Sequence, residues 1–313
     1  MSQNALYFPF VVPPVTGGDF IAIDHIAALN RLGFDAKALY LGKDLGYLKF
    51  PVPTVSRGVR LNRNDIIIIG EVYKQIFEQV RSMDCVKVLH DQNPFYTFFA
   101  FDSVQQLNEY PLTHIVTPGA YTKKLLHQLG VAKPILVVRP FIPSYFSPSE
   151  KHLQIAYTTH KRSSEPSFVM GVFRSRFPEL AHVPWVELRN MTRQGCATAM
   201  AQSAIYAAFP LLEGLGLMSL EAMASGCQVV GYVGGGGIEY VSDDNGVWIE
   251  EGDYEKFALT LKEACDLFLS KARNRYVENG ILTARQYSQE GFEQQIQEAY
   301  AQIMGSLAEK FRV

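Results

Sequence analysis

Residues 204–240 read AIYAAFPLLEGLGLMSLEAMASGCQVVGYVGGGGIEY. The apolar run Ala204–Phe209 predicts a buried strand, and Met218–Ser225 predicts a helix. Between them, a loop with Gly214 and Gly216 leads directly into the helix. Glycines at such a place let the backbone approach a ligand closely, and the helix N-terminus supplies unpaired N–H groups and a partial positive charge. A strand, a glycine loop and a helix in this order predict a binding site for an anion such as a diphosphate.

Two carboxylates lie within the same segment. Glu213 is in the loop ahead of the helix, and Glu221, eight positions later, lies about one turn into it. We expect each of them to hold hydroxyl groups of one sugar nucleotide, the transferred sugar at one and the ribose at the other. A helix cap with nearby acidic residues is the simpler interpretation, but it does not explain the glycine run Gly234–Gly237. A dinucleotide fingerprint fits poorly, because Ser219 stands where a third glycine is required.

Outward from this segment, short apolar strands alternate with amphipathic helical stretches, a pattern typical of parallel sheets flanked by helices. The strands predicted in the first half are Leu6–Val12, Ala36–Leu41, Ile66–Ile69, Val86–His90, Ile115–Val116 and Ile135–Val138. Those in the second half are Gln154–Tyr157, Trp185–Leu188, Ala204–Phe209, Gln228–Tyr232 and Val247–Ile249. The predicted helices are Phe20–Leu32, Ala120–Leu129, Glu165–Arg176, Thr192–Gln202, Met218–Ser225 and Asp253–Phe268, followed by a helical stretch from about 271 to 312.

The proline-rich stretch Pro140–Pro148 disfavours both a helix and a central strand, so we place the boundary between two Rossmann-like domains there. The predicted fold is α/β, with an N-terminal domain over residues 1–147, a C-terminal domain over 148–290 and a final helix over 291–313. Because the final helix has no strand of its own, we expect it to cross back to the first domain. Sheets of this kind bind ligands beyond the carboxyl ends of their strands, so the expected site is a cleft between the two domains.

Composition argues against several classes of protein. Of 313 residues, 48% are apolar and 19% charged, and the net charge of −2 argues against nucleic-acid binding. The four cysteines are scattered, which indicates reduced thiols of a cytoplasmic protein rather than disulfides or a zinc site. The N-terminal stretch is broken by Pro13 and Pro14 and does not match a signal peptide, and no apolar run approaches the ~20 residues of a membrane span. Contact with the inner surface of a membrane is left open.

The motif E-G-x-G-L-x-x-x-E-A-M-A-x-G, at residues 213–226, resembles the core motif of the retaining GT-B glycosyltransferases called glycosyl transferases group 1 (family 4-like). The resemblance can be followed from about residue 154 to about residue 261, and the N-terminal half matches more loosely. It implies a GT-B fold and a bacterial enzyme of polysaccharide biosynthesis. The implied reaction is transfer of a hexose-type sugar from a nucleotide diphosphate to a hydroxyl acceptor, carbohydrate or lipid-linked, with retained anomeric configuration. We expect no metal ion and no other cofactor.

The same resemblance implies roles for individual residues. Glu213 is expected to orient the donor sugar, and Glu221 to bind the ribose. The donor-binding loop and helix start are expected to include Gly214, Gly216, Leu217 and Met218.

A diphosphate leaving group also requires positive charge, and two cations follow the first strand of the second domain. The family often carries an arginine and a lysine there. In this chain His160 stands where the arginine is expected, Lys161 matches the lysine, and Arg162 is an additional cation. We expect Lys161 and Arg162 to bind the diphosphate.

In the first domain, Gly17 and Gly18 follow the first strand and open a helix. The resemblance implies that this turn closes over the donor phosphates and the acceptor, and Asp19 is expected to be the N-cap of the helix.

His90 ends a predicted strand, where a histidine of related enzymes often contacts the transferred sugar. We predict a catalytic role for His90, and a hydrogen-bonded core histidine is the alternative. Gln92, Asn93 and Tyr96 are candidates for contacts with the acceptor.

Two other functions remain open at this point. The His160 departure and the short first domain are compatible with a non-catalytic GT-B protein that binds a sugar nucleotide or a partner. A different GT-B reaction, such as epimerisation or phosphorolysis, is the other.

Overall fold

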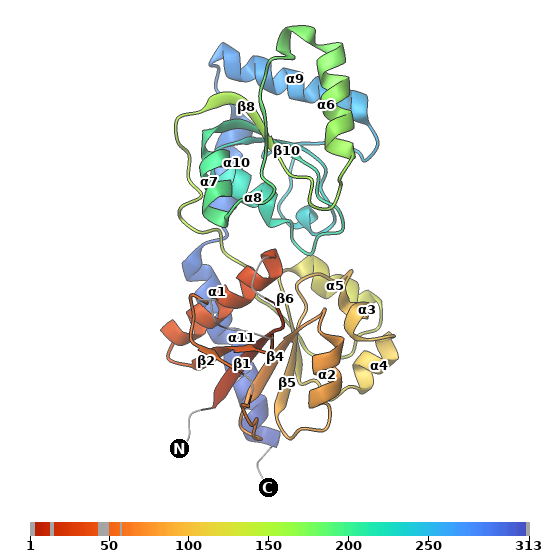
Figure 1. Cartoon of the computed structure of the whole chain (residues 1–313), viewed down its shortest axis with the longest axis vertical. Helices are drawn as coiled ribbons and strands as arrows, with labels where there is room; N and C mark the ends of the chain where they lie inside the picture. Colours follow the sequence, from red (N-terminus) through yellow and green to blue (C-terminus); the bar gives the residue numbers. More distant parts are fainter. Residues whose placement is uncertain (1–3, 13–15, 43–49, 57, 311–313) are drawn as a thin grey trace. The chain divides into compact units, whose positions relative to one another are not determined.

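The computed structural model describes residues 4–12, 16–42, 50–56 and 58–310. They form two compact units (Figure 1). Unit 1 comprises the residues up to Pro140 together with those from Glu290 onward, and unit 2 is Phe141–Gln289. The first boundary therefore falls at the start of the proline-rich stretch rather than at residue 147, and most of that stretch belongs to unit 2.

Unit 1 is built on a seven-stranded parallel sheet with the order β3-β2-β1-β4-β5-β6-β7. The strands are β1 (Ala5–Phe10), β2 (Asp35–Tyr40), β3 (Thr54–Val55), β4 (Ile66–Gly70), β5 (Val86–His90), β6 (His114–Thr117) and β7 (Ile135–Val137). The strand order reverses between β1 and β4. In open α/β sheets, ligands bind at the carboxyl ends of the strands beside such a switch point.

Helices cover both faces of this sheet. On one face, α1 (Gly17–Arg31) meets α11 (Gln289–Lys310), because His25 of α1 contacts the rings of Phe292 and Tyr300. The other face packs against α2 (Lys74–Val80), α3 (Thr97–Ala100), α4 (Val104–Glu109) and α5 (Ala120–Gln128). In Figure 1, α11 is blue and lies among elements coloured red to yellow, so the C-terminal helix crosses back to unit 1, as predicted.

Unit 2 is built on a five-stranded parallel sheet with the order β12-β11-β10-β8-β9. The strands are β8 (His152–Tyr157), β9 (Trp185–Glu187), β10 (Ser203–Ala208), β11 (Gln228–Gly231) and β12 (Val247–Trp248). The order reverses between β8 and β10, which is the switch point of this unit.

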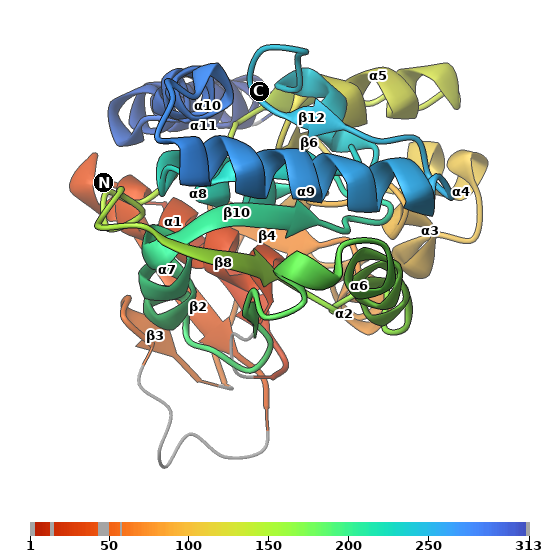
Figure 2. The ribbon, with the colours of Figure 1, turned by 90° about the horizontal axis from the view of Figure 1, so that it is seen from above.

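Helices also cover both faces of the unit 2 sheet. Figure 2 shows α9 lying along β8 and β10. One face packs against α6 (Glu165–Arg176) and α9 (Tyr254–Ser270). The other packs against α7 (Arg193–Gln202), α8 (Leu217–Ala224) and α10 (Arg275–Arg285).

Every strand predicted from the sequence is present, with ends that differ by at most a few residues. The elements that sequence patterns missed are short: β3 has 2 residues, and α2, α3 and α4 have 7, 4 and 6. Helices of this length show too few turns for a 3.6-residue periodicity. The final helical stretch is two helices, α10 in unit 2 and α11 in unit 1, and its last residues, 311–312, lie outside the described ones. No helix in the described part of the chain is long and apolar enough to cross a membrane.

Two histidines lie in the core of unit 1, between its sheet and the helices α1 and α11. His25 is fully buried, and its ring centroid lies 4.5 Å from that of His90. Among the described residues, neither ring nitrogen of His25 has a hydrogen-bond partner. Burial lowers the pKa of both rings, that of His90 to about 3. Both rings are therefore neutral in the folded protein at neutral pH.

We expect His25→Leu to make the protein more resistant to acid. Below a pH of about 6.5 the unfolded chain binds a proton at His25 and the folded chain does not, so stability falls as the pH falls. The His25→Leu variant lacks this proton-binding group. The difference in unfolding free energy between the variant and the wild type should therefore be ~2 kcal/mol more favourable to the variant at about pH 5 than at about pH 7.5. Urea unfolding at the two pH values measures this difference. Ile26→Leu, a neighbouring core change without a titrating group, should shift stability equally at the two pH values. A shift that is equally independent of pH in His25→Leu would contradict the prediction.

Candidate active site

Unit 2 brings two predicted residues together at the switch point of its sheet. Lys161 follows β8 and Glu213 follows β10, and these strands are neighbours where the strand order reverses. Lys161 Nζ lies 3.0 Å from Glu213 Oε1 and donates a hydrogen bond to the carbonyl oxygen of Leu212 at 3.2 Å. The predicted cation and the predicted carboxylate are therefore in direct contact.

The glycine run after β11 fixes the loop that carries Glu213. The Glu213 N–H donates to the carbonyl oxygen of Gly234 at 2.8 Å, and the Gly236 N–H donates to the carbonyl oxygen of Glu213 at 2.9 Å. A Cβ at Gly236 would lie 2.0 Å from the Gly214 carbonyl oxygen, and one at Gly234 would lie 2.4 Å from Pro210. Backbone-to-backbone contact between the two loops therefore requires glycine, and this contact holds the Glu213 backbone in place.

Gly216 is the N-cap of α8 and has a φ of 84°, in the left-handed region that favours glycine. Its carbonyl oxygen accepts a hydrogen bond from the Tyr240 hydroxyl at 2.7 Å. No side chain caps the start of the eight-residue helix α8 in the described structure. The first N–H groups of the helix, which include those of Leu217 and Met218, therefore form an end suited to an anion.

Glu221 is also on α8, but its surroundings differ from those of Glu213. Its side chain is 6% exposed, against 27% for Glu213. Arg193, the first residue of α7, donates to Glu221 Oε1 from both Nε and Nη2 at 3.3 Å. A buried carboxylate requires such hydrogen-bond and charge partners. Arg193 therefore orients Glu221 and supplies a cation beside its carboxylate.

Arg162, which is predicted from the sequence to bind the diphosphate, pairs with carboxylates of unit 2. Its Nη1 lies 2.7 Å from Glu165 Oε2, its Nη2 lies 2.6 Å from Glu251 Oε2, and its Nε donates to the Pro210 carbonyl oxygen at 3.1 Å. The guanidinium also lies over the Tyr232 ring, 5.0 Å from its centroid. The contacts of the Arg162 guanidinium thus connect α6 to neighbouring loops. Lys161, by contrast, contacts Glu213.

The predicted glycine turn of unit 1 begins α1, but the N-cap is Thr16 and not Asp19. Thr16 Oγ1 accepts from the Asp19 N–H at 3.3 Å, and Asp19 Oδ2 accepts from the Thr16 N–H at 2.9 Å. Asp19 is therefore the third helical residue of a capping box. Gly17 faces open space, and Gly18 lies against the side chain of Gln92.

The remaining candidates follow β5. His90 is 3% exposed and packs against Phe8 and His25, which gives it the place of a core histidine. Its Nε2 has no hydrogen-bond partner among the described residues, so the predicted hydrogen bond is absent at that atom. Asn93 is buried, and Tyr96 is partly buried.

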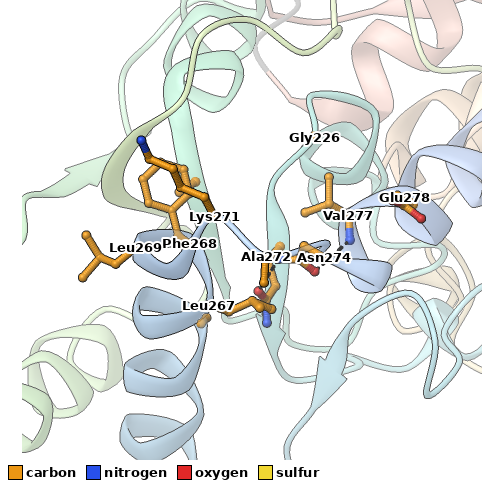
Figure 3. A pocket seen from close by; sticks show the side chains of 12 residues that line it. Gly226, Leu267, Phe268, Leu269, Lys271, Ala272, Asn274, Val277 and Glu278 are labelled. Atoms are coloured by element: carbon orange, nitrogen blue, oxygen red, sulfur yellow. Dashed lines mark hydrogen bonds between the residues drawn. The ribbon is translucent and has the colours of Figure 1, made fainter.

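A hollow of ≈ 460 Å³ lies elsewhere in unit 2 (Figure 3). Its walls include Leu267 and Phe268 at the end of α9 and Val277 on α10. Ala204 and Gln228, at the amino ends of β10 and β11, also line it. Glu213 follows the opposite, carboxyl end of β10, so this hollow is separate from the candidate site.

Comparisons with known proteins decide the family. The model of the glycosyl transferases group 1 matches residues 180–283, which include both glutamates and Arg193. An alpha-1,6-glucosyltransferase from Actinobacillus pleuropneumoniae serotype 7 (strain AP76) is 37% identical over 312 residues, covering 95% of this chain and 94% of the relative. The chain belongs to the glycosyl transferases group 1. It is therefore an enzyme, a hexosyl-type glycosyltransferase, as the sequence predicts.

Solved structures agree with the fold of this glycosyltransferase. The pneumococcal O-GlcNAc transferase GtfA, in complex with UDP and GlcNAc, aligns over 97% of this chain and all of its own (100%), with a TM-score of 0.74 and 9% identity. Anabaena HepE in complex with UDP-glucose aligns over 95% of this chain and 99% of its own, with a TM-score of 0.71 and 14% identity. At these identities the likeness concerns the fold alone, and the fold is GT-B, as predicted.

Two residues of the glycosyltransferase site were not predicted from the sequence. Arg193 lies 28 positions from Glu221, and Tyr240 lies 24 positions from Gly216. Neither separation corresponds to a helical or strand period, so no local pattern links the partners. The sequence offers one clue to Tyr240: it closely follows the glycine run, and that run pairs with the loop that carries Glu213.

We expect Arg193→Met and Glu221→Gln to be coupled in stability. Removing Arg193 alone leaves the buried Glu221 carboxylate without its cation, which should cost ~1–3 kcal/mol of unfolding free energy. Once Glu221 is neutral, the same removal should cost less, so the double variant should be more stable than the sum of the single changes predicts. Urea unfolding of the four proteins gives the coupling energy. Arg176→Met, which breaks an exposed ion pair with Glu255, should change little, and purely additive effects at Arg193 and Glu221 would contradict the assignment.

Proposed function

We propose that this glycosyltransferase transfers a glucosyl group from UDP-glucose to the 6-hydroxyl of a carbohydrate acceptor, with retention of the α configuration and without a metal ion. The observation that carries the proposal is the 37% identity over nearly the whole chain to an alpha-1,6-glucosyltransferase. UDP is present in the structures of GtfA and HepE, and HepE was also solved with UDP-glucose. These likenesses support the choice of uracil as the base and glucose as the sugar.

Retention follows from the chemistry of the proposed donor and product. UDP-glucose carries its sugar in the α configuration, and the name of the relative gives an α-1,6 product. If this chain makes the same linkage, the bond from C1 to the diphosphate oxygen breaks and the bond from C1 to the acceptor oxygen forms on the same face of the sugar. The proton of the acceptor hydroxyl group passes to the departing diphosphate.

The proposed donor site is the carboxyl edge of unit 2. Lys161 and the N–H groups at the start of α8 neutralise the diphosphate as it departs, which is the main electrostatic demand of the reaction. Glu213, 3.0 Å from Lys161 Nζ, positions this cation and contacts the glucosyl hydroxyl groups. Glu221 accepts hydrogen bonds from the ribose hydroxyl groups, and Arg193 holds it in the required orientation. A lysine and a helix N-terminus supply positive charge of the kind that a metal ion would otherwise provide.

Other residues complete the proposal. Gly17 and Gly18, at the start of α1, let backbone approach the donor phosphates and the acceptor. Arg162 is assigned to the scaffold of unit 2, because its guanidinium pairs with Glu165 and Glu251. His90 is assigned to the scaffold of unit 1, because its side chain is buried. The free cysteines Cys85, Cys196, Cys227 and Cys265 favour a cytoplasmic location. A role in bacterial polysaccharide synthesis, at or near the inner membrane surface, fits an enzyme with these substrates.

We expect UDP to stabilise the protein in the presence of EDTA. At a UDP concentration of ~100 Kd, binding to the folded state should add roughly 2–3 kcal/mol to the free energy of unfolding, and GDP, ADP and TDP should add less. A thermal-shift titration with each nucleotide, with EDTA or with magnesium, measures this. Lys161→Met and Glu221→Ala should lose the shift, whereas Lys262→Met, which removes a partly exposed lysine paired with Asp266 on α9, should keep it. A shift that requires magnesium would overturn the metal-independent mechanism.

Glu213→Gln should lower kcat for glucosyl transfer from UDP-glucose by about 100-fold or more, since it removes the charge that positions Lys161 and the sugar. The dissociation constant of UDP should change far less than kcat, because UDP lacks the sugar that Glu213 contacts and Lys161 is still present to bind the diphosphate. Radiolabelled transfer to isomaltose gives kcat, and NMR of the product gives the anomeric configuration. Glu255→Gln, on the exposed surface of unit 2, is the matched control. Near-normal turnover by Glu213→Gln would refute the role given to this carboxylate.

A further inference from the structure

The hollow at the amino edge of the unit 2 sheet has walls that are mainly apolar (Figure 3). Its volume of ≈ 460 Å³ lies within the ~300–1,000 Å³ that is typical of small-molecule sites. The apolar walls come from α9, the linker 271–274, α10 and the start of β10, and comprise Ala204, Ala264, Leu267, Phe268, Ala272 and Val277. Such walls suit an apolar ligand and offer few hydrogen-bond partners to a sugar or a nucleotide.

A cation lies in the lining of this hollow. Lys271 directly follows the last residue of α9 and is exposed. The nearest acidic residues in the sequence are Asp266 and Glu278. The first of them pairs with Lys262 and the second with Arg273, and no carboxylate in the described part of the chain pairs with Lys271. The hollow therefore offers an ammonium group whose charge is available to a ligand.

The helix end does not by itself account for a lysine at this position. Lys271 is the C-cap of α9 and has a φ of 54°, in the left-handed region where glycine is the usual residue. Glycine would end the helix with less strain, because it has no Cβ. A strained side chain of this kind points to a role outside the helix, and a negatively charged ligand in the hollow would supply one.

A second unused donor lies in the wall. Gln228, the first residue of β11, lines the hollow and is 3% exposed. Its Oε1 accepts from Asn274 Nδ2 at 2.8 Å, whereas its Nε2 donates to no group within the described residues. A nearly buried donor without an acceptor costs free energy, which a ligand in the hollow can recover. Because Asn274 is only three residues beyond Lys271, the two unused donors lie at the same end of the hollow.

The chemistry of a ligand follows from these groups. Both unused groups are donors, and the Glu278 carboxylate, which also lines the hollow, accepts from Nε and Nη2 of Arg273. A carboxylate only accepts hydrogen bonds and carries the single negative charge that one ammonium group balances. We propose that the hollow binds a fatty acid, with its hydrocarbon chain against Phe268 and its carboxylate at Lys271 and the Gln228 amide. This proposal goes beyond glucosyl transfer and does not depend on it.

Other ligands fit the same groups less well. A peptide would bring N–H groups, but the side-chain acceptors that line the hollow, on Gln228, Asn274 and Glu278, already accept hydrogen bonds. Its N–H groups would therefore be desolvated without partners there. A phosphate monoester would bring a second negative charge close to the Glu278 carboxylate, which repels it.

Calorimetric titration of the full chain with sodium decanoate, below the concentration at which micelles form, tests the site. One decanoate should bind per chain. Ala272→Trp places an indole ring at the hollow and should raise the Kd at least tenfold. Leu259→Trp, at an exposed position of α9 that does not line the hollow, is the matched control and should change the Kd less than twofold. Equal Kd values in the two variants, or no saturable binding by the wild type, would overturn the proposal.

A second variant separates a ligand contact from a structural role. Lys271→Gly relieves the left-handed backbone, so the melting temperature should stay the same or rise while the Kd of decanoate rises at least tenfold. Lys271→Arg keeps the charge and should bind decanoate within threefold of the wild type. Decanol, which lacks the charge, should bind the wild type at least tenfold more weakly than decanoate does. An unchanged Kd in Lys271→Gly would show that the lysine does not hold the head group and would overturn the proposal.

Vesicles distinguish a free fatty acid from a bilayer. Sedimentation with vesicles of phosphatidylglycerol and phosphatidylcholine should be the same for the wild type and Ala272→Trp. Vesicle binding that Ala272→Trp abolishes, without binding of decanoate in a one-to-one ratio, would overturn the proposal in favour of a membrane surface. Decyl phosphate that binds more than tenfold tighter than decanoate would overturn the choice of a carboxylate.

Discussion

The candidate site of unit 2 depends on a contact between two backbones. The loop after β10 and the glycine run after β11 approach so closely that a Cβ at Gly236 would lie 2.0 Å from the Gly214 carbonyl oxygen. Two backbone hydrogen bonds, one on each side of Glu213, join the loops. The position of the Glu213 carboxylate, its pairing with Lys161 and the direction in which α8 starts all follow from this contact. It is possible only because the chain has glycine at these positions, so the glycine run has a packing role.

The two glutamates of the motif have different physical surroundings. Glu213 is partly exposed and pairs with Lys161, whose long side chain is flexible. If the lysine moves its charge toward a phosphate, the Glu213 carboxylate is still in contact with solvent. Glu221 is buried and paired with a guanidinium that reaches it from two nitrogens, so its position is fixed before any ligand arrives. One carboxylate is thus free to respond to the ligand, and the other is preorganised. This difference is consistent with the proposal that the reacting sugar contacts the first and the ribose, which does not react, contacts the second.

Unit 1 separates its polar groups between the core and one edge. His25 and His90 are neutral rings within an aromatic cluster, and their burial removes them from the chemistry of the surface. Glu71, Asp91 and Gln92, which directly follow strand ends, lie at the edge where parallel strands present their carboxyl ends. The hydroxyl of Thr97 connects that edge to the aromatic residues of α3.

The sequence by itself determined the alternation of strands and helices, the two Rossmann-like units and the loop and helix of the 213–226 motif. Apolar periodicity and glycine positions are local properties, and they are sufficient to place buried strands and a helix that begins beside a glycine turn. Only the tertiary structure decided which charges meet. Arg162 follows Lys161 directly, yet the first is bound by two carboxylates of the scaffold and the second contacts Glu213. Arg193 reaches Glu221 from another helix, and His90 ends a strand but faces the core. Side-chain partners depend on how elements distant in the chain pack together, and that packing has no signature in the local spacing of residues.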